Sequence, residues 1–257
     1  MSASLGTLFL IPNTLGDESR AEQLPWVLPR ETIAQTAKLV HWVVEDAKTA
    51  RAFLKAVDSV TPLVCSIQEM QMSEWRGVAR NAKYGDAVKP LDLLKPLMHG
   101  KDMGLMSEAG VPGVADPGAE IVLAAHKLGA KVKPLVGPSS ILLGLMASGL
   151  NGQRFAFQGY IPHNAQDRIA KLKYLETESR KLQQTQIWIE TPYRNTAMLM
   201  ACLNTLAPQS LLCIGMDLSL ATETITTLPI ADWRKRFPNE AACTSLQNRP
   251  AVFLLLA

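Results

Sequence analysis

Residues 105–118 read Leu-Met-Ser-Glu-Ala-Gly-Val-Pro-Gly-Val-Ala-Asp-Pro-Gly and join a short apolar segment to a segment of helical period. The twelve residues from Ser107 to Gly118 are a long connection, because loops between a strand and a helix usually take about two to six residues. Ligands of open α/β sheets bind beyond the carboxyl ends of the strands, and glycines let main-chain amides approach a ligand closely. The stretch therefore predicts either a main-chain binding loop for a small polar ligand or a conformationally demanding structural turn.

A second turn of this kind follows the next predicted strand. It reads Val136-Gly137-Pro138-Ser139-Ser140, and capping of the following helix would by itself explain the two serines. Because both turns precede helices of one predicted sheet, we expect them to lie at the same edge and to form two walls of one pocket. Neither turn matches the glycine pattern of dinucleotide sites or the phosphate loop that ends in Lys-Ser/Thr.

Short runs of Val, Ile and Leu alternate with longer segments of helical period along the whole chain, which is typical of a mostly parallel sheet covered by helices. The fold class is therefore α/β. In the first half, strands are expected at 7–11, 40–44, 63–67, 103–106 and 131–136, and helices at 30–38, 46–56, 86–98, 118–128 and 139–148. In the second half, strands are expected at 155–159, 186–189, 211–216, 223–227 and 251–256, and helices at 167–181 and after residue 192.

The length of 257 residues fits one large domain or two compact ones. The turn-rich stretch Ser-Gly-Leu-Asn-Gly at 148–152 ends the helix before it and is read as a linker. We therefore expect an N-terminal α/β domain at 1–150 and a C-terminal α/β domain at 151–257.

Composition excludes several classes of protein. With 47% hydrophobic and 19% charged residues, the chain resembles neither disordered nor collagen-like sequences. The net charge of +3 is too small to indicate nucleic-acid binding, and the four scattered cysteines predict neither a disulfide framework nor a metal site. The longest apolar run is too short for a membrane span, and no basic segment precedes the apolar start, so we expect a cytoplasmic protein.

The motifs in their order resemble the tetrapyrrole-methylase superfamily, a class III group of methyltransferases. The resemblance rests on Ser107–Gly118, on Gly-Pro-Ser-Ser at 137–140, on Ala-Ser-Gly-Leu at 147–150 and on Arg-Phe-Ala-Phe-Gln-Gly-Tyr-Ile-Pro at 154–162. Within it, the sequence is most similar to the small-subunit rRNA 2′-O-methyltransferase I branch. Farther along, Glu-Thr-Pro-Tyr-Arg at 190–194 is similar to the Glu-Ser-Pro-His-Arg of that branch.

This resemblance implies a homodimeric enzyme that binds S-adenosylmethionine in a cleft between its two α/β domains and releases S-adenosylhomocysteine. It requires no metal. Carried over residue by residue, it assigns the donor contacts to Pro12, Ser107, Glu108, Ala109, Gly110, Val114, Ala115, Asp116, Ser139, Ser140, Glu190 and Met216. For Pro12 and Met216, a strand-end turn and a core methionine remain equally good interpretations.

A hydroxyl acceptor would also profit from a general base, which typically contributes about 10²- to 10⁴-fold. Glu45, Asp46 and Glu108 are the carboxylates that the predicted topology places best. Each is explained equally well as a charge that stabilises a helix N-terminus. The catalytic residue is therefore left open.

Some segments depart from the branch. Its opening Thr-Pro-Ile-Gly-Asn-Leu-Gly-Asp is one residue shorter here, at Ile11–Asp17, and Glu45-Asp46 is not followed by Thr-Arg. A histidine-rich stretch of the branch is replaced by Ser-Ile-Gln-Glu-Met-Gln at 66–71. Because the donor loop is kept, we hypothesise that the donor is retained and that the acceptor is open to change.

The leading interpretation is a methyltransferase that transfers the methyl group by in-line displacement to an RNA ribose hydroxyl or a related acceptor. A tetrapyrrole or other small-molecule acceptor is one alternative. A non-catalytic module that binds S-adenosylmethionine or S-adenosylhomocysteine is another, supported by the shortened first loop.

Overall fold

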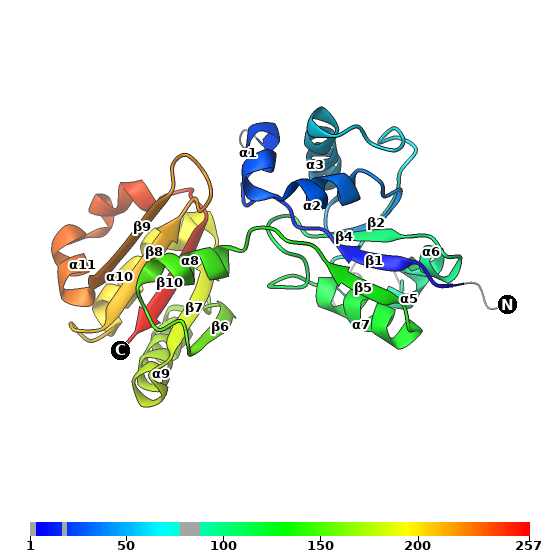
Figure 1. Cartoon of the computed structure of the whole chain (residues 1–257). Helices are drawn as coiled ribbons and strands as arrows, with labels where there is room; N and C mark the ends of the chain where they lie inside the picture. The colour runs from blue at the N-terminus through cyan, green and yellow to red at the C-terminus, as the bar shows by residue number, and fades with distance from the viewer. Residues whose placement is uncertain (1–3, 17–19, 78–87) are drawn as a thin grey trace. The chain divides into compact units, whose positions relative to one another are not determined.

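The computed structural model describes residues 4–16, 20–77 and 88–257, and Figure 1 shows their helices and strands. The chain divides into two compact units, Met1–Ser139 and Ser140–Ala257. Each unit contains one five-stranded sheet with helices packed against it, which confirms the predicted α/β class. Asp17 and the first two residues of the helix predicted at 86–98 lie outside the described residues.

The first unit is built on a parallel sheet with the order β3-β2-β4-β1-β5. Its strands are β1 (Thr7–Leu10), β2 (His41–Val44), β3 (Gln71–Glu74), β4 (Met103–Met106) and β5 (Lys131–Pro134). Its helices are α1 (Arg20–Val27), α2 (Arg30–Thr36), α3 (Ala47–Val60), α5 (Pro90–Leu93), α6 (Lys95–Met98) and α7 (Gly118–Leu128). The central strand β4 is buried along its whole length, as its apolar sequence predicts for a strand covered on both faces.

Side chains of alternate strand residues point to opposite faces of the sheet and pack into two separate hydrophobic cores. Phe9, Trp42 and Met106 pack against the first three helices, whereas Leu8, Val43 and Leu105 pack against the helices from α5 to α7. The sheet is therefore the middle layer of three. All of its strands run in one direction, so the loops that follow them leave from one edge.

The strand predicted at 63–67 is wrong, and the third strand of the sheet is β3 instead. Leu63, Cys65 and Ile67 pack against the core while Val64 and Ser66 are exposed, so the segment has the alternating burial of a strand. Its backbone nevertheless forms bends and a turn, with the Val64 amide donating to the carbonyl of Ala37. Alternation of apolar residues indicates which side chains face the core, but it does not by itself show that the segment pairs with another strand.

The second unit is built on a mixed sheet with the order β6-β7-β10-β8-β9. Its strands are β6 (Phe155–Tyr160), β7 (Thr185–Glu190), β8 (Leu211–Met216), β9 (Thr224–Pro229) and β10 (Ala251–Leu256). Its helices are α8 (Ser140–Ser148), α9 (Ala165–Leu182), η1 (Pro192–Arg194), α10 (Asn195–Thr205), α11 (Ile230–Arg236) and η2 (Glu240–Leu246). Only β6 and β7 are parallel neighbours, and the other three pairs are antiparallel.

Helix α8 explains why the units divide at residue 139 and not at the predicted residue 150. It packs against β8, β9 and β10 of the second sheet. The contact is close at Gly144, where a Cβ atom would lie 2.7 Å from Val252 Cγ1. The turn at 148–152 therefore joins two elements of one unit. A turn-rich composition marks the end of a helix but does not identify the sheet on which that helix packs.

The described residues hold neither a membrane-spanning helix nor a cluster of metal ligands. Among the described residues, no helix combines the length and the apolar character that a bilayer crossing requires. Within the same residues, no group of three or more His, Cys, Asp or Glu side chains is placed to hold a metal ion. The four cysteines are free, and burial raises the pKa of the Cys202, Cys213 and Cys243 thiols.

Candidate functional site

The loop that leaves β4 is organised by the carboxylate of Asp116. Its Oδ2 atom accepts a hydrogen bond from the Gly113 amide at 2.7 Å, and its Oδ1 atom accepts one from the Gly118 amide at 2.5 Å. Gly113 and Ala115 both have left-handed backbone conformations, with φ of 82° and 63°. Burial raises the pKa of Asp116, although the amides that donate to it lower the pKa. The turn is thus held by one partly buried side chain.

The same loop is fastened to the end of β1 by Asn13, which is fully buried. The Asn13 side-chain amide donates to the carbonyl of Glu108 at 2.7 Å and to that of Ser107 at 3.4 Å. The backbone amide of Asn13 donates to the carbonyl of Gly110 at 2.9 Å. No motif marks Asn13 in the sequence, although it lies in the shortened first loop at Ile11–Asp17.

Two glycines bring the predicted turns together. Gly110 has φ of 67°, and a Cβ atom on it would lie 3.3 Å from the carbonyl oxygen of Pro138. A Cβ atom on Gly137 would lie 2.2 Å from Cβ of Pro12. The loop after β4, the turn after β5 and the end of β1 therefore meet at one edge of the first sheet, as predicted. Pro12 lies two residues after the end of β1, in contact distance of the Gly137 turn, and both of its interpretations stay open.

Side chains of the loop differ in exposure. Ser107 is buried, and its hydroxyl donates to the carbonyl of Ala109 at 3.1 Å. Glu108, Ala109, Val114 and Ala115 are exposed. The loop thus presents main-chain groups and small side chains at the sheet edge, which suits a ligand with several polar groups.

The candidate carboxylates lie beside this loop and have different roles. Asp46 caps helix α3 by accepting from the Thr49 amide at 2.7 Å, and this hydrogen bond is the main reason that its pKa is lowered. Glu45 Oε2 accepts from the amide of Glu108 at 3.2 Å. The helix-capping interpretation therefore holds for Asp46. This hydrogen bond, from the main-chain amide of Glu108 to the Glu45 carboxylate, joins the end of β2 to the loop after β4.

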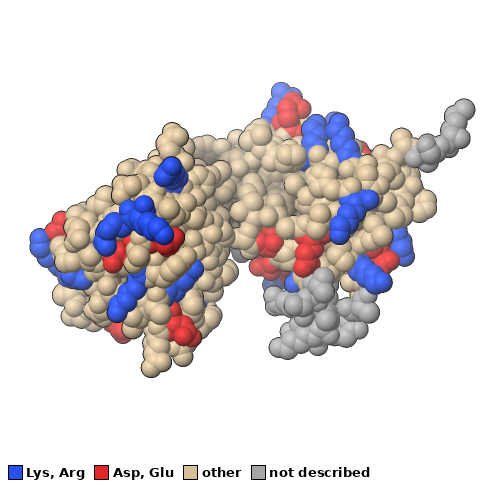
Figure 2. Space-filling view, turned by 90° about the horizontal axis from the view of Figure 1, so that it is seen from below, with Lys and Arg blue, Asp and Glu red and all other residues tan. Residues whose placement is uncertain are grey.

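Arg76 is a further residue of this region that the sequence analysis missed. Its Nη2 atom lies 3.3 Å from Asp46 Oδ1 and 3.4 Å from Glu74 Oε2, and its Nε atom donates to the Glu45 carbonyl. Figure 2 shows acidic side chains gathered on one side of the first unit. Arg76 balances part of the negative charge of Asp46 and Glu74. No motif marked it, because a single arginine after a short strand has no distinctive spacing.

In the second unit, Glu190 and Arg194 form a buried ion pair. Arg194 Nε lies 3.0 Å from Glu190 Oε2, and both side chains are almost completely buried. Burial raises the pKa of Glu190, while the positive charges of Arg194 and Arg168 lower it. Arg194 Nη2 also donates to the carbonyls of Ile161 and Pro162, at 3.4 and 3.3 Å. The motif at 190–194 therefore joins the ends of β6 and β7.

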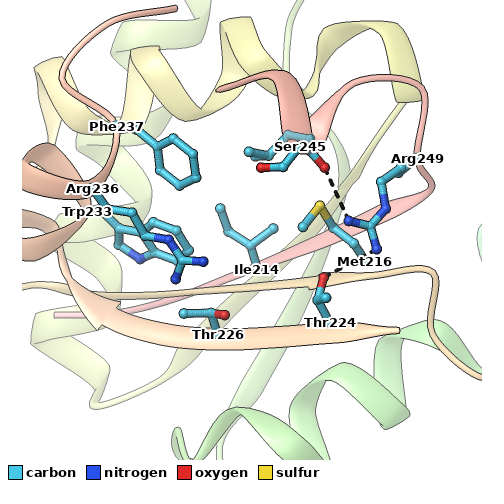
Figure 3. Close-up of a pocket in the computed structure, with 10 residues that line it drawn as sticks. Ile214, Met216, Thr224, Thr226, Trp233, Arg236, Phe237, Ser245 and Arg249 are labelled. Carbon is cyan, nitrogen blue, oxygen red and sulfur yellow. Dashed lines mark hydrogen bonds between the residues drawn. The ribbon is translucent and has the colours of Figure 1, made fainter. Parts of the chain in front are cut away.

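The register of the second sheet places Glu190 and Met216 at one edge, because both pair with Ala251 at the start of β10. Met216 contributes to the wall of a cavity of about 130 Å³, shown in Figure 3, which lies within this unit. Arg249, another wall residue, is held by Asp217 at 2.7 Å and by the carbonyl of Ser245 at 3.2 Å. Met216 is thus neither a fully buried core residue nor a confirmed ligand contact.

The predicted donor contacts are divided between the two units. The first unit brings Pro12 together with Gly110 and the rest of the loop at 107–116, and Ser139 follows the turn that meets this loop. Ser140, Glu190 and Met216 belong to the second unit. Ser140 is the first residue of α8.

Comparison with known proteins gives relatives over part of the chain. No family model matches it. It is 34% identical over 140 residues to ribosomal RNA small subunit methyltransferase I of Vibrio cholerae, covering 54% of this chain and 47% of that protein. It is 33% identical over 164 residues to the protein of the same name from Pseudomonas aeruginosa, covering 63% and 54%. The chain spans about half the length of these relatives. The resemblance to this branch is confirmed over that part.

Solved structures share the fold over almost the whole chain. The methyltransferase CobJ superposes with a TM-score of 0.57 at 14% identity, covering 98% of this chain and 94% of that one. Uroporphyrin-III C-methyl transferase from Thermus thermophilus, solved in complex with S-adenosyl homocysteine, gives 0.55 at 15% identity, covering 98% and 97%. The fold is therefore that of these methyltransferases.

Proposed function

We propose that this protein is a methyltransferase that uses S-adenosylmethionine and transfers its methyl group to an RNA ribose hydroxyl or a related acceptor. The observation that carries the proposal is the meeting of the loop at 107–118 with the Gly137-Pro138 turn at the edge of the first sheet. The names of the curated relatives support the activity, since they are small-subunit rRNA methyltransferases. A structural neighbour that binds S-adenosylhomocysteine supports the donor.

The residues present fit this donor. Its methionine end carries an amino and a carboxylate group, which main-chain carbonyls and amides can hold, and its adenine needs apolar walls with a few hydrogen bonds. The exposed turn from Glu108 to Ala115 offers such main-chain groups, and Val114 is an exposed apolar side chain beside them. Pro12, the loop at 107–116 and Ser139 are the proposed contacts of the first unit. Ser140, Glu190 and Met216 remain predicted contacts of the second.

The bound donor supplies an electrophilic methyl group on a sulfonium. The chain contributes mainly by aligning the acceptor oxygen with that methyl group, an effect that can reach about 7–11 kcal/mol. A base near the acceptor would take the hydroxyl proton. Asp46 is disfavoured for this role, because its carboxylate caps α3 and pairs with Arg76. Glu45 and Glu108 remain the candidates.

An rRNA acceptor is favoured over a tetrapyrrole because the curated relatives carry that name, and it would place the protein in the cytoplasm. The homodimer is part of the same proposal and rests on the family resemblance. A methyl-transfer assay with labelled S-adenosylmethionine and ribosomal subunits distinguishes an enzyme from a module that binds the donor without catalysis. Such a module would bind S-adenosylhomocysteine but would transfer no labelled methyl group to the subunits.

Replacing Ser139 with tryptophan is expected to weaken S-adenosylhomocysteine binding about tenfold or more, because the indole would fill the space beside the Pro138 turn. Isothermal titration calorimetry measures this. Ser73→Trp is the matched control, since Ser73 is an exposed residue of β3 in the same unit. This variant should bind S-adenosylhomocysteine with the affinity of the wild type. A wild-type protein that binds no S-adenosylhomocysteine would contradict the donor. Equal affinity in both variants would contradict the placement of the site.

A further inference from the structure

Two of the tyrosines have more than half of their surface exposed at one edge of the second sheet. Tyr160 is the last residue of β6 and is 57% exposed, and Tyr193, in η1 after β7, is 72% exposed. Strands β6 and β7 are parallel neighbours, with Tyr160 in register with Ile189. The two aromatic side chains therefore follow adjacent strands at the same, carboxyl, edge.

The backbone segments that carry these two tyrosines are joined by the buried side chain of Arg194. Arg194 directly follows Tyr193 and is buried against Glu190, and its Nη2 atom donates to the carbonyls of Ile161 and Pro162, just after Tyr160. One guanidinium thus ties the two segments together. Rings on a fixed backbone lose little conformational freedom when a flat partner lies against them.

Charge at this edge is nearly balanced. Arg168, in the first turn of α9, donates from Nη1 to the carbonyl of His163, and the adjacent Asp167 is acidic. Two ion pairs of this edge, Arg194 with Glu190 and Arg249 with Asp217, neutralise each other's charges. Figure 2 also shows basic side chains of the second unit in separate groups, with acidic ones among them. Attraction of phosphates is therefore a small part of any RNA affinity at this edge, and the exposed aromatic rings are its feature that best fits a nucleic-acid base.

We propose that Tyr160 and Tyr193 form a stacking surface for unpaired bases of an RNA acceptor. This inference rests on the proposed function, which it extends from the donor to the way in which the acceptor is held. Sequence-specific and sequence-tolerant RNA recognition both place unstacked bases on exposed aromatic rings. A methyltransferase that must reach a ribose hydroxyl gains from such contacts, because they hold the neighbouring nucleotides away from a helical stack.

The test measures binding of a short fluorescent single-stranded RNA to the full chain by anisotropy. Tyr160→Ala and Tyr193→Ala are each expected to weaken binding about 5- to 150-fold, the range of a lost base–ring stack. Tyr160→Phe and Tyr193→Phe should retain wild-type affinity, because phenylalanine keeps the ring. The slope of affinity against salt should be unchanged in all four variants, since no charge is removed.

Tyr174→Ala is the matched control. Tyr174 is also 54% exposed, but it lies inside α9, where the Lys171 ammonium is 5.1 Å from its ring centroid. Its replacement should leave RNA affinity unchanged. Unchanged affinity in the Tyr160→Ala/Tyr193→Ala double variant, or an equal loss in the Phe variants, would overturn the stacking surface.

Calorimetry with S-adenosylhomocysteine separates this inference from the proposed function. All tyrosine variants should bind it as the wild type does. If the wild type binds S-adenosylhomocysteine and the alanine variants keep full RNA affinity, the stacking surface is wrong and the donor site stands. If the wild type binds RNA through these rings but no S-adenosylhomocysteine, the proposed donor is wrong.

Discussion

Replacing Glu190 with alanine is expected to lower the free energy of unfolding by about 3–5 kcal/mol, because it leaves the Arg194 guanidinium buried without its charged partner. The Nε atom of Arg194 lies 3.0 Å from the carboxylate that would be removed, and both side chains are almost fully buried. The two remaining acceptors of Arg194 are carbonyls at 3.3 and 3.4 Å, which do not replace a charge. Denaturant unfolding followed by circular dichroism measures the change.

The matched control removes both charges. Glu190→Met combined with Arg194→Leu is expected to recover most of the lost stability, because replacing a buried ion pair by apolar residues is often neutral or stabilising by about 1–4 kcal/mol. If the double variant were as unstable as Glu190→Ala, the loss would come from packing and not from an unpaired charge.

The same carboxylate predicts a dependence of stability on pH. Burial raises the pKa of Glu190 in the folded protein, so its proton is bound more tightly there than in the unfolded chain. The stability linked to this proton is fully present below the unfolded pKa of about 4.5 and is lost as the pH rises through the folded pKa. Protonation does not repeat the loss expected for Glu190→Ala, because the protonated carboxyl still offers an oxygen to Arg194 Nε, whereas alanine offers none. Relative to Glu190→Gln, the wild type should gain stability as the pH falls from neutrality towards that value. A constant difference would contradict the raised pKa.

Replacing Asp116 with alanine is expected to weaken S-adenosylhomocysteine binding about tenfold or more and to lower the free energy of unfolding. The change removes the acceptor of the Gly113 and Gly118 amides, and each buried donor left unsatisfied costs about 1–3 kcal/mol. Without these hydrogen bonds, Ala115 loses two contacts that flank it and favour its left-handed conformation. Calorimetry and denaturant unfolding measure the two effects.

Asp102→Ala controls for the loss of a carboxylate in the same unit. Asp102 also accepts a hydrogen bond from a backbone amide, that of Thr7 at 2.7 Å, but it lies at the opposite end of the strands. Its replacement should cost some stability and leave the affinity for S-adenosylhomocysteine unchanged. Equal loss of affinity in the Asp102 and Asp116 variants would show that general destabilisation, and not the donor loop, sets the affinity.

Much of the fold could be predicted from the sequence, because each part rests on a local signal. The apolar run at 103–106 becomes the buried β4, and the period at 118–128 becomes α7, whose end is marked by Gly129 in a left-handed conformation. The convergence of the two glycine-bearing turns followed from parallel topology alone. The loop at 107–118 was recognised because its length and its glycines are unusual for a strand–helix connection.

Features that depend on tertiary contacts could not be predicted. The segment at 63–67 has the spacing of a strand but packs without strand pairing, and the true edge strand Gln71–Glu74 is polar. Asn13 and Arg76 become part of the candidate site through partners about 30 to 95 residues away in the chain. Helix α11 has a short and basic sequence, and it is fixed by Trp233, whose indole donates to the carbonyl of Leu212.

Strand β10 occupies the middle of the second sheet, between β7 and β8, although it comes after every other strand of that sheet in the chain. On the ribosome, the first sheet has all of its strands once Pro134 has emerged, whereas the second has a gap at its centre until residues 251–256 arrive. Strand β8 is complete at Met216 and β10 at Leu256, so at translation rates of about 5–20 residues per second the gap lasts roughly 2 to 8 s. During it, the facing edges of β7 and β8 are unpaired, so newly made second units are the part of this protein that most needs protection by chaperones.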